Sequence, residues 1–194
     1  MNRRSLLKLG IAAAAFVVGG GHTPYQQWTV YRLKHLLIGT SKADPASYAV
    51  GKRVATLLAE RLPESKARVT RGPDARRLAS LIATGQIAVI VLRRAEAAAL
   101  AEGSGDFAAY GPVALHGLFD LGDHILVSRG DFPDRHAYLV AKTLAEHTKK
   151  WTGTGQYSDG PVPVHAGARA FALKQPLPNL KESDVAAAPG SHRH

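Results

Sequence analysis

The chain has 194 residues, and its 25 Lys and Arg outnumber 15 Asp and Glu to give a net charge of +10. This length fits one domain and is enough to bury a core, while the lack of Cys excludes disulfides, Cys-ligated metal centres and a thiolate nucleophile. The charge favours anionic partners without choosing among them, but aromatic residues make up only 7%, so no nucleic-acid partner is expected.

Residues 1–21 predict an export signal. Arg3 and Arg4 precede an apolar run over 9–18, and this run is too short to span a bilayer comfortably. The segment Arg3-Arg4-Ser5-Leu6-Leu7-Lys8 resembles a twin-arginine signal, which carries folded proteins to the periplasm. An ordinary secretory signal is the alternative. Because no clear Ala-x-Ala cleavage site follows, an uncleaved tether to the inner membrane also stays open.

Strands and helices alternate in the expected structure that follows a linker at 22–34. Pro45 opens a helix with Asp44 as its N-cap, and Pro63 ends it. Residues 86–92 form a continuous β-branched run, which is typical of a buried strand. The other expected strands cover 33–41, 66–71, 112–119 and 124–129. The other expected helices run from Asp74 to Gly85, over 93–103, from 134 to about 151, and within 162–173.

This alternation predicts an α/β domain over 35–173 with a parallel sheet. A disordered tail is expected over 174–194. In such sheets, ligands bind at the carboxyl ends of the strands, against helix N-termini. Three loops fall there: Gly39–Pro45, Gly72–Asp74 and Leu92–Arg94. The sequence therefore predicts a cleft whose backbone N–H groups face an anion.

Four segments, taken in order, resemble the solute receptors of the TAXI type, which serve tripartite ATP-independent periplasmic (TRAP) transporters. The first is a strand ending Ile38-Gly39-Thr40 that is followed by Tyr48-Ala49-Val50-Gly51. The second and third are 68–92 and 124–147. The fourth, Val162-Pro163-Val164-His165-Ala166-Gly167-Ala168-Arg169, is similar to a Pro-Leu-His-Pro-Gly-Ala-x-Arg motif. Together these segments cover most of 35–173.

The resemblance implies a Rossmann-like three-layer lobe of a type 2 periplasmic binding protein fold with a mostly parallel sheet. It implies an exported protein that binds a small anionic solute, such as an organic acid or amino acid, with TRAP permease subunits or another membrane protein as partners. No cofactor is expected. The residues expected to contact the solute are Gly39, Thr40, Ser41, Tyr48, Gly72, Pro73, Asp74 and Arg93.

Two departures from the family bear on this expectation. Family members have two lobes, and the second would be inserted between Val91 and Ile125, where about thirty residues remain. The Gly-rich loop of the family is replaced by Lys42-Ala43-Asp44-Pro45-Ala46-Ser47. A single lobe does not close over a solute and exclude water. A homodimer that replaces the missing lobe stays open.

Two other functions stay open beside solute binding. A degenerate receptor domain would serve as an accessory or protein-interaction module at the membrane. A cryptic exported hydrolase would use Ser41, Ser47 or Ser128 as nucleophile, but none lies in a Gly-x-Ser-x-Gly elbow. We therefore expect a binding protein and not an enzyme.

The nine His residues lack the spacing of a metal motif, so no metal site is expected. Asp120, Asp123 and His124 lie close in sequence, and a solvated turn explains them better than a metal does. Arg93 and Arg94 directly follow the buried strand. Two interpretations of this pair stay open, an anion clamp and a solvated helix start.

Overall fold

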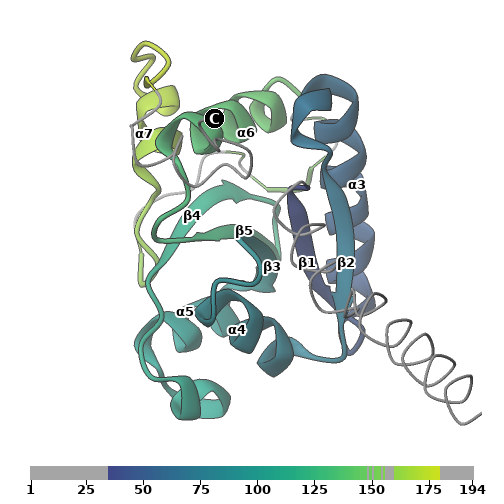
Figure 1. Ribbon diagram of the computed structural model, residues 1–194, viewed down its shortest axis with the longest axis vertical. Coiled ribbons are helices and arrows are strands. Elements are labelled where there is room, and N and C mark those ends of the chain that lie inside the picture. Colours follow the sequence, from purple (N-terminus) through teal and green to yellow (C-terminus); the bar gives the residue numbers. More distant parts are fainter. Residues whose placement is uncertain (1–34, 148, 150, 154, 156–159, 180–194) are drawn as a thin grey trace, which may run out of the picture. The chain divides into compact units, whose positions relative to one another are not determined.

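The structure is a computed structural model that describes residues 35–147, 149, 151–153, 155 and 160–179 (Figure 1). The segments predicted as an export signal (1–21) and a linker (22–34), and the part of the predicted tail from 180, lie outside these residues. Five strands form one sheet in the order β2-β1-β3-β5-β4. The strands are β1 (Leu37–Ser41), β2 (Arg68–Gly72), β3 (Val89–Arg93), β4 (Leu115–Asp120) and β5 (His124–Arg129). The helices are α3 (Pro45–Arg61), α4 (Ala75–Ala83), α5 (Arg94–Glu102), α6 (Asp134–Ala145) and α7 (Ala166–Ala172), with 3₁₀ turns η1 (Pro63–Ser65) and η2 (Gly105–Tyr110).

The sheet is mixed, so the expectation of a mostly parallel sheet is only partly right. Strand β1 pairs in parallel with β2 and β3, whereas β5 is antiparallel to both β3 and β4. The reason is the connection between β4 and β5, which spans only 121–123. A connection this short reverses the chain, because a parallel pair needs a crossover of a dozen or more residues.

The helix starts of the first half follow their predicted caps. Asp44 precedes α3, and its side chain accepts a hydrogen bond from the Ser47 N–H. Asp74 precedes α4 in the same way and accepts from the Arg77 N–H at 2.8 Å. Helix α5 ends at Glu102 and is capped by Gly103, whose φ of 67° is the left-handed conformation that glycine adopts at least cost. These side-chain caps confirm the predicted starts of α3 and α4.

Helix α6 is shorter than predicted. The sequence pattern indicated a helix to about 151 with His147 on its apolar side, but α6 ends at Ala145. Two side chains from beyond the helix contact carbonyl groups of its last turn. His147 Nδ1 lies 2.9 Å from the Thr143 carbonyl, and Trp151 Nε1 donates to the Leu144 carbonyl at 3.1 Å. The His147 ring thus partners a carbonyl of the last helical turn, and the Leu144 carbonyl, which also accepts from the His147 N–H at 3.1 Å, gains a second donor.

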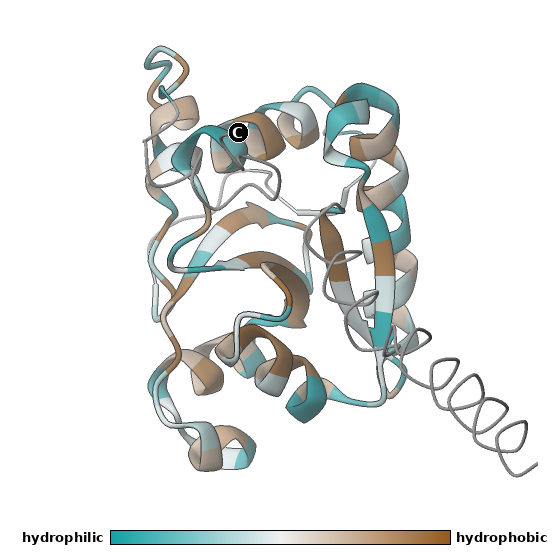
Figure 2. Ribbon diagram, in the orientation of Figure 1, coloured by the Kyte–Doolittle hydropathy of each residue, from teal (hydrophilic) through white to brown (hydrophobic). Residues whose placement is uncertain are grey.

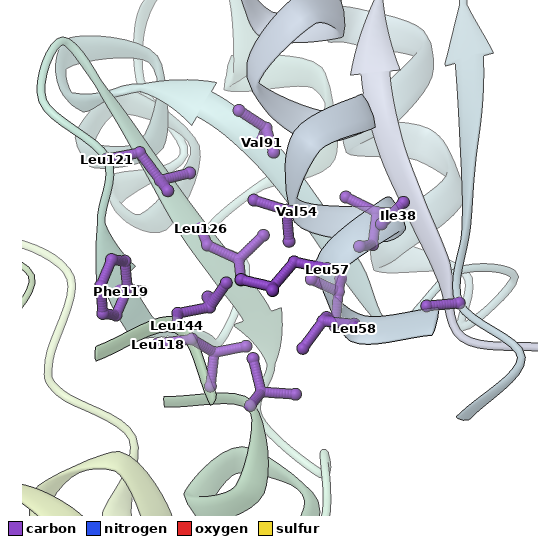
Figure 3. Close-up of a cluster of buried hydrophobic side chains, with 14 of the residues drawn as sticks. Ile38, Val54, Leu57, Leu58, Val91, Leu118, Phe119, Leu121, Leu126 and Leu144 are labelled. Carbon is purple, nitrogen blue, oxygen red and sulfur yellow. The ribbon is translucent and has the colours of Figure 1, made fainter. Parts of the chain in front are cut away.

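Apolar side chains cover both faces of the sheet, so the domain has helices on each side. Successive residues of β3 point to opposite faces: Val89 and Val91 join one core cluster and Ile90 and Leu92 the other. The first cluster includes side chains of α3 and α6 and is drawn in Figure 3; the second includes side chains of α4 and α5. Figure 2 shows the brown inner strands between helices whose outer sides are hydrophilic.

The segment before α7 covers the β4 edge of the sheet. Gly117 N–H donates to the Pro163 carbonyl at 2.8 Å, and His165 N–H donates to the Gly117 carbonyl at 2.9 Å. Gly167 packs so closely on α6 that an added Cβ would clash with the Asp134 carbonyl. Beyond α7, Tyr138 of α6 donates to the Gln175 carbonyl at 3.0 Å.

A single sheet and its helices account for the described chain. Between Val91 and Ile125, where the resemblance to the TAXI-type receptors would place a second lobe, the chain forms the end of β3, then α5, η2, β4 and the turn to β5. All of these belong to the single sheet or pack on it. No helix among the described residues is long and apolar enough to cross a membrane.

Candidate functional site

The three loops predicted to share one edge of the sheet do come together. Lys42 N–H donates to the Gly72 carbonyl at 2.8 Å, and Ala43 N–H donates to the Pro73 carbonyl at 3.1 Å. The third loop joins them through an ion pair between Arg93 and Asp44. Because β1, β2 and β3 are parallel, their carboxyl ends meet at this edge, which we call the strand-tip edge.

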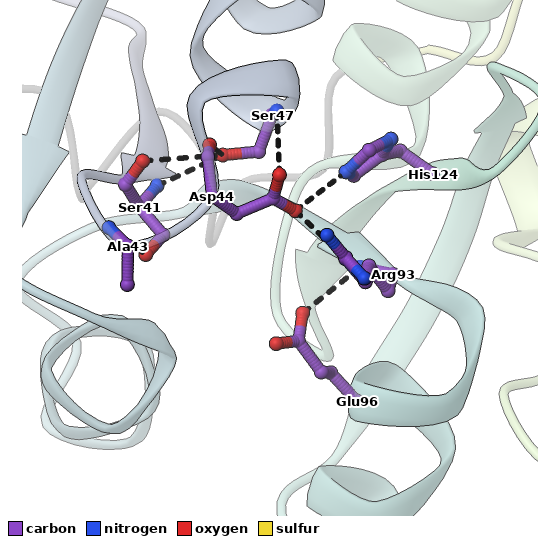
Figure 4. Close-up of polar contacts among 7 residues, drawn as sticks. All are labelled: Ser41, Ala43, Asp44, Ser47, Arg93, Glu96 and His124. Carbon is purple, nitrogen blue, oxygen red and sulfur yellow. Dashed lines mark hydrogen bonds and ion pairs between the residues drawn. The ribbon is translucent and has the colours of Figure 1, made fainter.

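Asp44 lies at the centre of the strand-tip edge (Figure 4). Its Oδ2 lies 3.0 Å from Arg93 Nε and 2.7 Å from His124 Nε2. Its Oδ1 accepts a longer hydrogen bond of 3.4 Å from the Ser47 N–H. An ionised carboxylate only accepts hydrogen bonds, so His124 Nε2 carries the proton between them.

The sheet register places the two donors side by side. Arg93 is the last residue of β3 and His124 the first of β5, and the two residues are directly paired across the ladder. Paired residues direct their side chains to the same face of a sheet. That face carries α3, whose N-cap is Asp44. The ion pair therefore follows from strand register and helix capping together.

The Asp44 carboxylate is buried, with 7% of the residue exposed. Burial alone would raise the pKa of this carboxyl, because it disfavours the charged form. The hydrogen bonds from Arg93 and His124 outweigh burial and hold the pKa of Asp44 well below its usual range. Asp44 is thus an anion at neutral pH, and it occupies the place at the α3 N-terminus where an external anion was expected.

The serines of the first loop serve the backbone. Ser47 Oγ donates to the Asp44 carbonyl at 2.7 Å and accepts from the Ser41 N–H at 3.1 Å. Ser41 Oγ accepts from the Ala43 N–H at 3.1 Å. Both serines are buried. These bonds fix the turn between β1 and α3, which holds Asp44 in position.

Several predicted contact residues lie inside the domain. Gly39 faces the core, where an added Cβ would lie 2.8 Å from Ile87 Cδ1. Thr40 is fully buried, and its hydroxyl donates to the Thr70 carbonyl at 2.9 Å. Gly72 is buried at the end of β2. These residues build the strands beneath the strand-tip edge and present no side chain on its surface.

Tyr48, Pro73, Asp74 and Arg93 lie closer to the surface. Pro73 and Asp74 are exposed, and Asp74 caps α4. Tyr48 is half-buried, and the Arg71 guanidinium lies 4.3 Å from its ring centroid. The structure brings Asp74 and Arg93 to the same edge, and Tyr48 lies in the first turn of α3, against Arg71 of β2.

Arg93 and Arg94 are both bound to carboxylates of the chain. Arg94 Nη2 lies 2.6 Å from Asp120 Oδ1 and donates to the Gly122 carbonyl at 3.3 Å. Arg93 uses its Nε for Asp44, while its side chain stays 60% exposed. Its two Nη groups make no hydrogen bond to the described part of the chain. Arg93 is therefore a guanidinium held from one side with its outer edge toward solvent.

The turn before β5 is not solvated throughout, which corrects that expectation. Asp120 is 7% exposed and forms an ion pair with Arg94. His124 is 5% exposed and contacts the Asp44 carboxylate. Asp123 alone is exposed there. No group of three His, Cys, Asp or Glu among the described residues is placed to hold a metal ion.

Sequence reasoning missed the central role of Asp44. It identified Asp44 only as a helix cap, and it considered His124 only with its neighbours in sequence. The partners of Asp44 lie 49 and 80 residues away. One signal in the sequence could have indicated the contact with Arg93. Arg93 ends a predicted strand whose carboxyl end was expected beside that of β1, and this places Arg93 near the cap of α3.

Two polar atoms elsewhere in the described chain are buried without a hydrogen-bond partner: Ser128 Oγ and His116 Nδ1. Ser128 and His116 face each other across the β4–β5 ladder. Ser128 is fully buried, so a substrate has no access to its hydroxyl in this conformation. A pocket between β4, α6 and α7 is apolar; Leu118, Phe119, Ala141 and Phe171 are among the residues that line it.

The sequence matches no protein-family model and no curated protein sequence. The functional interpretation of the strand-tip edge therefore rests on the geometry of its own residues.

Proposed function

We propose that this chain is an exported binding protein, built like one lobe of a type 2 periplasmic binding protein, that contacts a carboxylate-bearing solute at the strand-tip edge. Export by the twin-arginine route and a relationship to the TAXI-type receptors of TRAP transporters are parts of this proposal. The helix-flanked sheet and the meeting of three loops at the carboxyl ends of β1, β2 and β3 support it.

The observation that carries the proposal is the orientation of Arg93. Its Nε is bound to the buried Asp44 carboxylate, which restricts the guanidinium. The exposed Nη groups then present two parallel donors, the arrangement that matches a carboxylate. Because the side chain is already ordered, less rotamer entropy is lost when a ligand binds.

The same geometry sets a limit on affinity. Asp44 already takes the N–H at the start of α3 and neutralises one positive charge. An external carboxylate therefore approaches from the solvent side and meets Arg93 and the exposed Lys42. With one lobe, the ligand stays partly hydrated, so we expect weak binding by the monomer. A second copy that covers this edge would exclude water and strengthen binding.

Titration of the isotope-labelled protein with organic acids and amino acids, followed by NMR chemical shifts, tests this proposal. We expect saturable shifts at Arg93 and Lys42, and a loss of at least ten-fold in affinity for Arg93→Gln. Arg68→Gln is the matched control, since it removes an exposed arginine at the opposite, amino end of the parallel strands. Equal losses for the two variants, or no saturable shift with any acid, would contradict the proposal.

The degenerate accessory module is the second candidate, and the internal Asp44 favours it. Because the Asp44 carboxylate already occupies the position expected for an anion, the site needs no solute there. This candidate predicts no solute-dependent shift at Arg93, together with a defined complex with a membrane protein that survives Arg93→Gln. The titration above therefore separates the two candidates.

A further inference from the structure

Positive charge is concentrated in one part of the domain. Residues 42–71 contain seven cations and three acids, whereas the rest of the described chain contains ten cations and nine acids. One of the three acids is the buried Asp44. The seven cations are all exposed: Lys42, Lys52, Arg53, Arg61, Lys66, Arg68 and Arg71. We call the surface they form the basic face.

The basic face lies on the outer side of α3 and on the edge strand β2, which run side by side in Figure 1. Its acidic members on the surface are Glu60 and Glu64. The hydrophilic outer turns of α3 are visible in Figure 2. Lys42 and Arg71 lie near the strand-tip edge, but the other five cations lie along α3 and toward the amino end of β2, away from it.

Six of the seven cations of the basic face have no carboxylate partner among the described residues. Lys42, Lys52, Arg61, Lys66, Arg68 and Arg71 form no ion pair with any described residue. Elsewhere in the described chain, ion pairs with carboxylates engage Arg76, Arg93, Arg94, Arg129 and Lys142. Uncompensated cations on one face create a local positive potential that attracts an anionic surface.

One guanidinium of the basic face is also ordered. Arg71 lies 4.3 Å from the centroid of the Tyr48 ring, which restrains it without neutralising it. The other cations are spread along a helix and a strand edge and do not converge on a pocket. Such a layout suits many dispersed negative groups better than one small anion.

The position of the chain entry indicates which anionic surface this is. Leu36, at the start of the domain, donates its N–H to the Ser65 carbonyl at 2.9 Å and accepts from the Arg68 N–H at 3.0 Å. The chain therefore enters the domain within the basic face. The preceding 13-residue linker, 22–34, spans at most about 45 Å. A tethered N-terminal segment would keep the basic face within this distance of the bilayer.

We propose that the basic face docks on the anionic phospholipid headgroups of the membrane from which the domain is tethered. Each Lys or Arg near such a surface adds to the attraction, and the contribution falls off within a Debye length. Docking in this way leaves the strand-tip edge available to a solute. The inference rests on the basic face and on the uncleaved N-terminal tether that the sequence leaves open, and it is independent of solute binding.

Sedimentation of the full chain with lipid vesicles tests the docking. Neutral phosphatidylcholine vesicles are compared with vesicles that contain phosphatidylglycerol, at low and high salt. The test variant is Lys52→Gln, Arg61→Gln, Lys66→Gln and Arg68→Gln combined. The control variant removes the same charge from exposed positions elsewhere, by Lys→Gln or Arg→Gln at Arg77, Lys142, Lys149 and Lys174. Both variants retain the N-terminal segment, and circular dichroism checks that they are folded.

We expect the wild type to partition more strongly onto anionic vesicles, with a preference that salt weakens. The basic-face variant should lose at least ten-fold of this preference and the control variant less than three-fold. Equal losses would show that net charge alone is responsible, and a wild type indifferent to phosphatidylglycerol would overturn the proposal. Basic-face-dependent binding to polyglutamate without vesicle binding would assign the face to an acidic protein instead.

Discussion

The strand-tip edge and the basic face use positive charge in opposite ways. At the strand-tip edge, the Arg93 guanidinium is paired with one buried carboxylate, to which His124 Nε2 also donates a hydrogen bond. On the basic face, Lys52, Arg61 and Arg68 stand exposed with no ion pair among the described residues. The first arrangement links strands β3 and β5 to helix α3. The second leaves its charge available to something outside the domain.

The difference follows from burial. A buried charge is costly unless it is paired and hydrogen-bonded, so Asp44 is held by several donors. An exposed cation stays hydrated and pairing it stabilises a fold very little. We therefore expect substitutions at the strand-tip edge to change stability and those on the basic face to change binding.

The largest expected effect on stability is that of Asp44→Ala. It leaves His124 Nε2 buried without its partner and removes the cap of α3. An unsatisfied buried donor and a lost cap together should lower the free energy of unfolding by about 3 kcal/mol. Urea denaturation measures this change.

Asp74→Ala is the matched control for Asp44→Ala, since Asp74 caps α4 while exposed to solvent. It should cost about 1 kcal/mol, the usual value of a cap alone. Similar losses for the two variants would show that the contacts of Asp44 with Arg93 and His124 add nothing to stability.

Much of this architecture could be predicted from local sequence patterns. Caps such as Asp44 and Asp74 and the β-branched run of β3 depend on neighbouring residues, and they marked the elements correctly. The direction of β5 follows from its short connection to β4, and the end of α6 involves side chains that lie beyond the helix. Trp151, for example, takes the Leu144 carbonyl from outside the helix.

The site was predictable at the level of loops but not of side chains. Parallel strand order brings the ends of β1, β2 and β3 together, so their loops were correctly grouped. The contact of His124 with Asp44 also needed the β3–β5 register, which the sequence pattern does not contain. The buried positions of Gly39 and Thr40 followed from the packing of α3 and α4 against β1.

A smaller effect should appear when the pH is lowered. The folded-state pKa of Asp44 lies below its value in the unfolded chain. The contribution of its ionised form is therefore fully present above about pH 4, the ordinary pKa of Asp, and is lost as the pH falls toward the folded-state value. Thermal unfolding between pH 2 and pH 7 should show the stability difference between wild type and Asp44→Asn shrinking below about pH 4. A difference that stays constant over this range would mean that the carboxylate charge is not what stabilises the edge.

The smallest expected effect belongs to the basic face itself. Arg71 is exposed and Tyr48 only half-buried, so the attraction of the guanidinium for the ring should contribute about 0.5 kcal/mol. A double-mutant cycle of Tyr48→Leu with Arg71→Gln, measured by urea denaturation, isolates this coupling. The same cycle with Arg68→Gln should give none, because Arg68 is not stacked on Tyr48. A coupling of several kcal/mol would show that the contact of Arg71 with Tyr48 is structural, like the buried pairs of the strand-tip edge. Arg71 would then no longer belong with the cations of the basic face that are available to an outside partner.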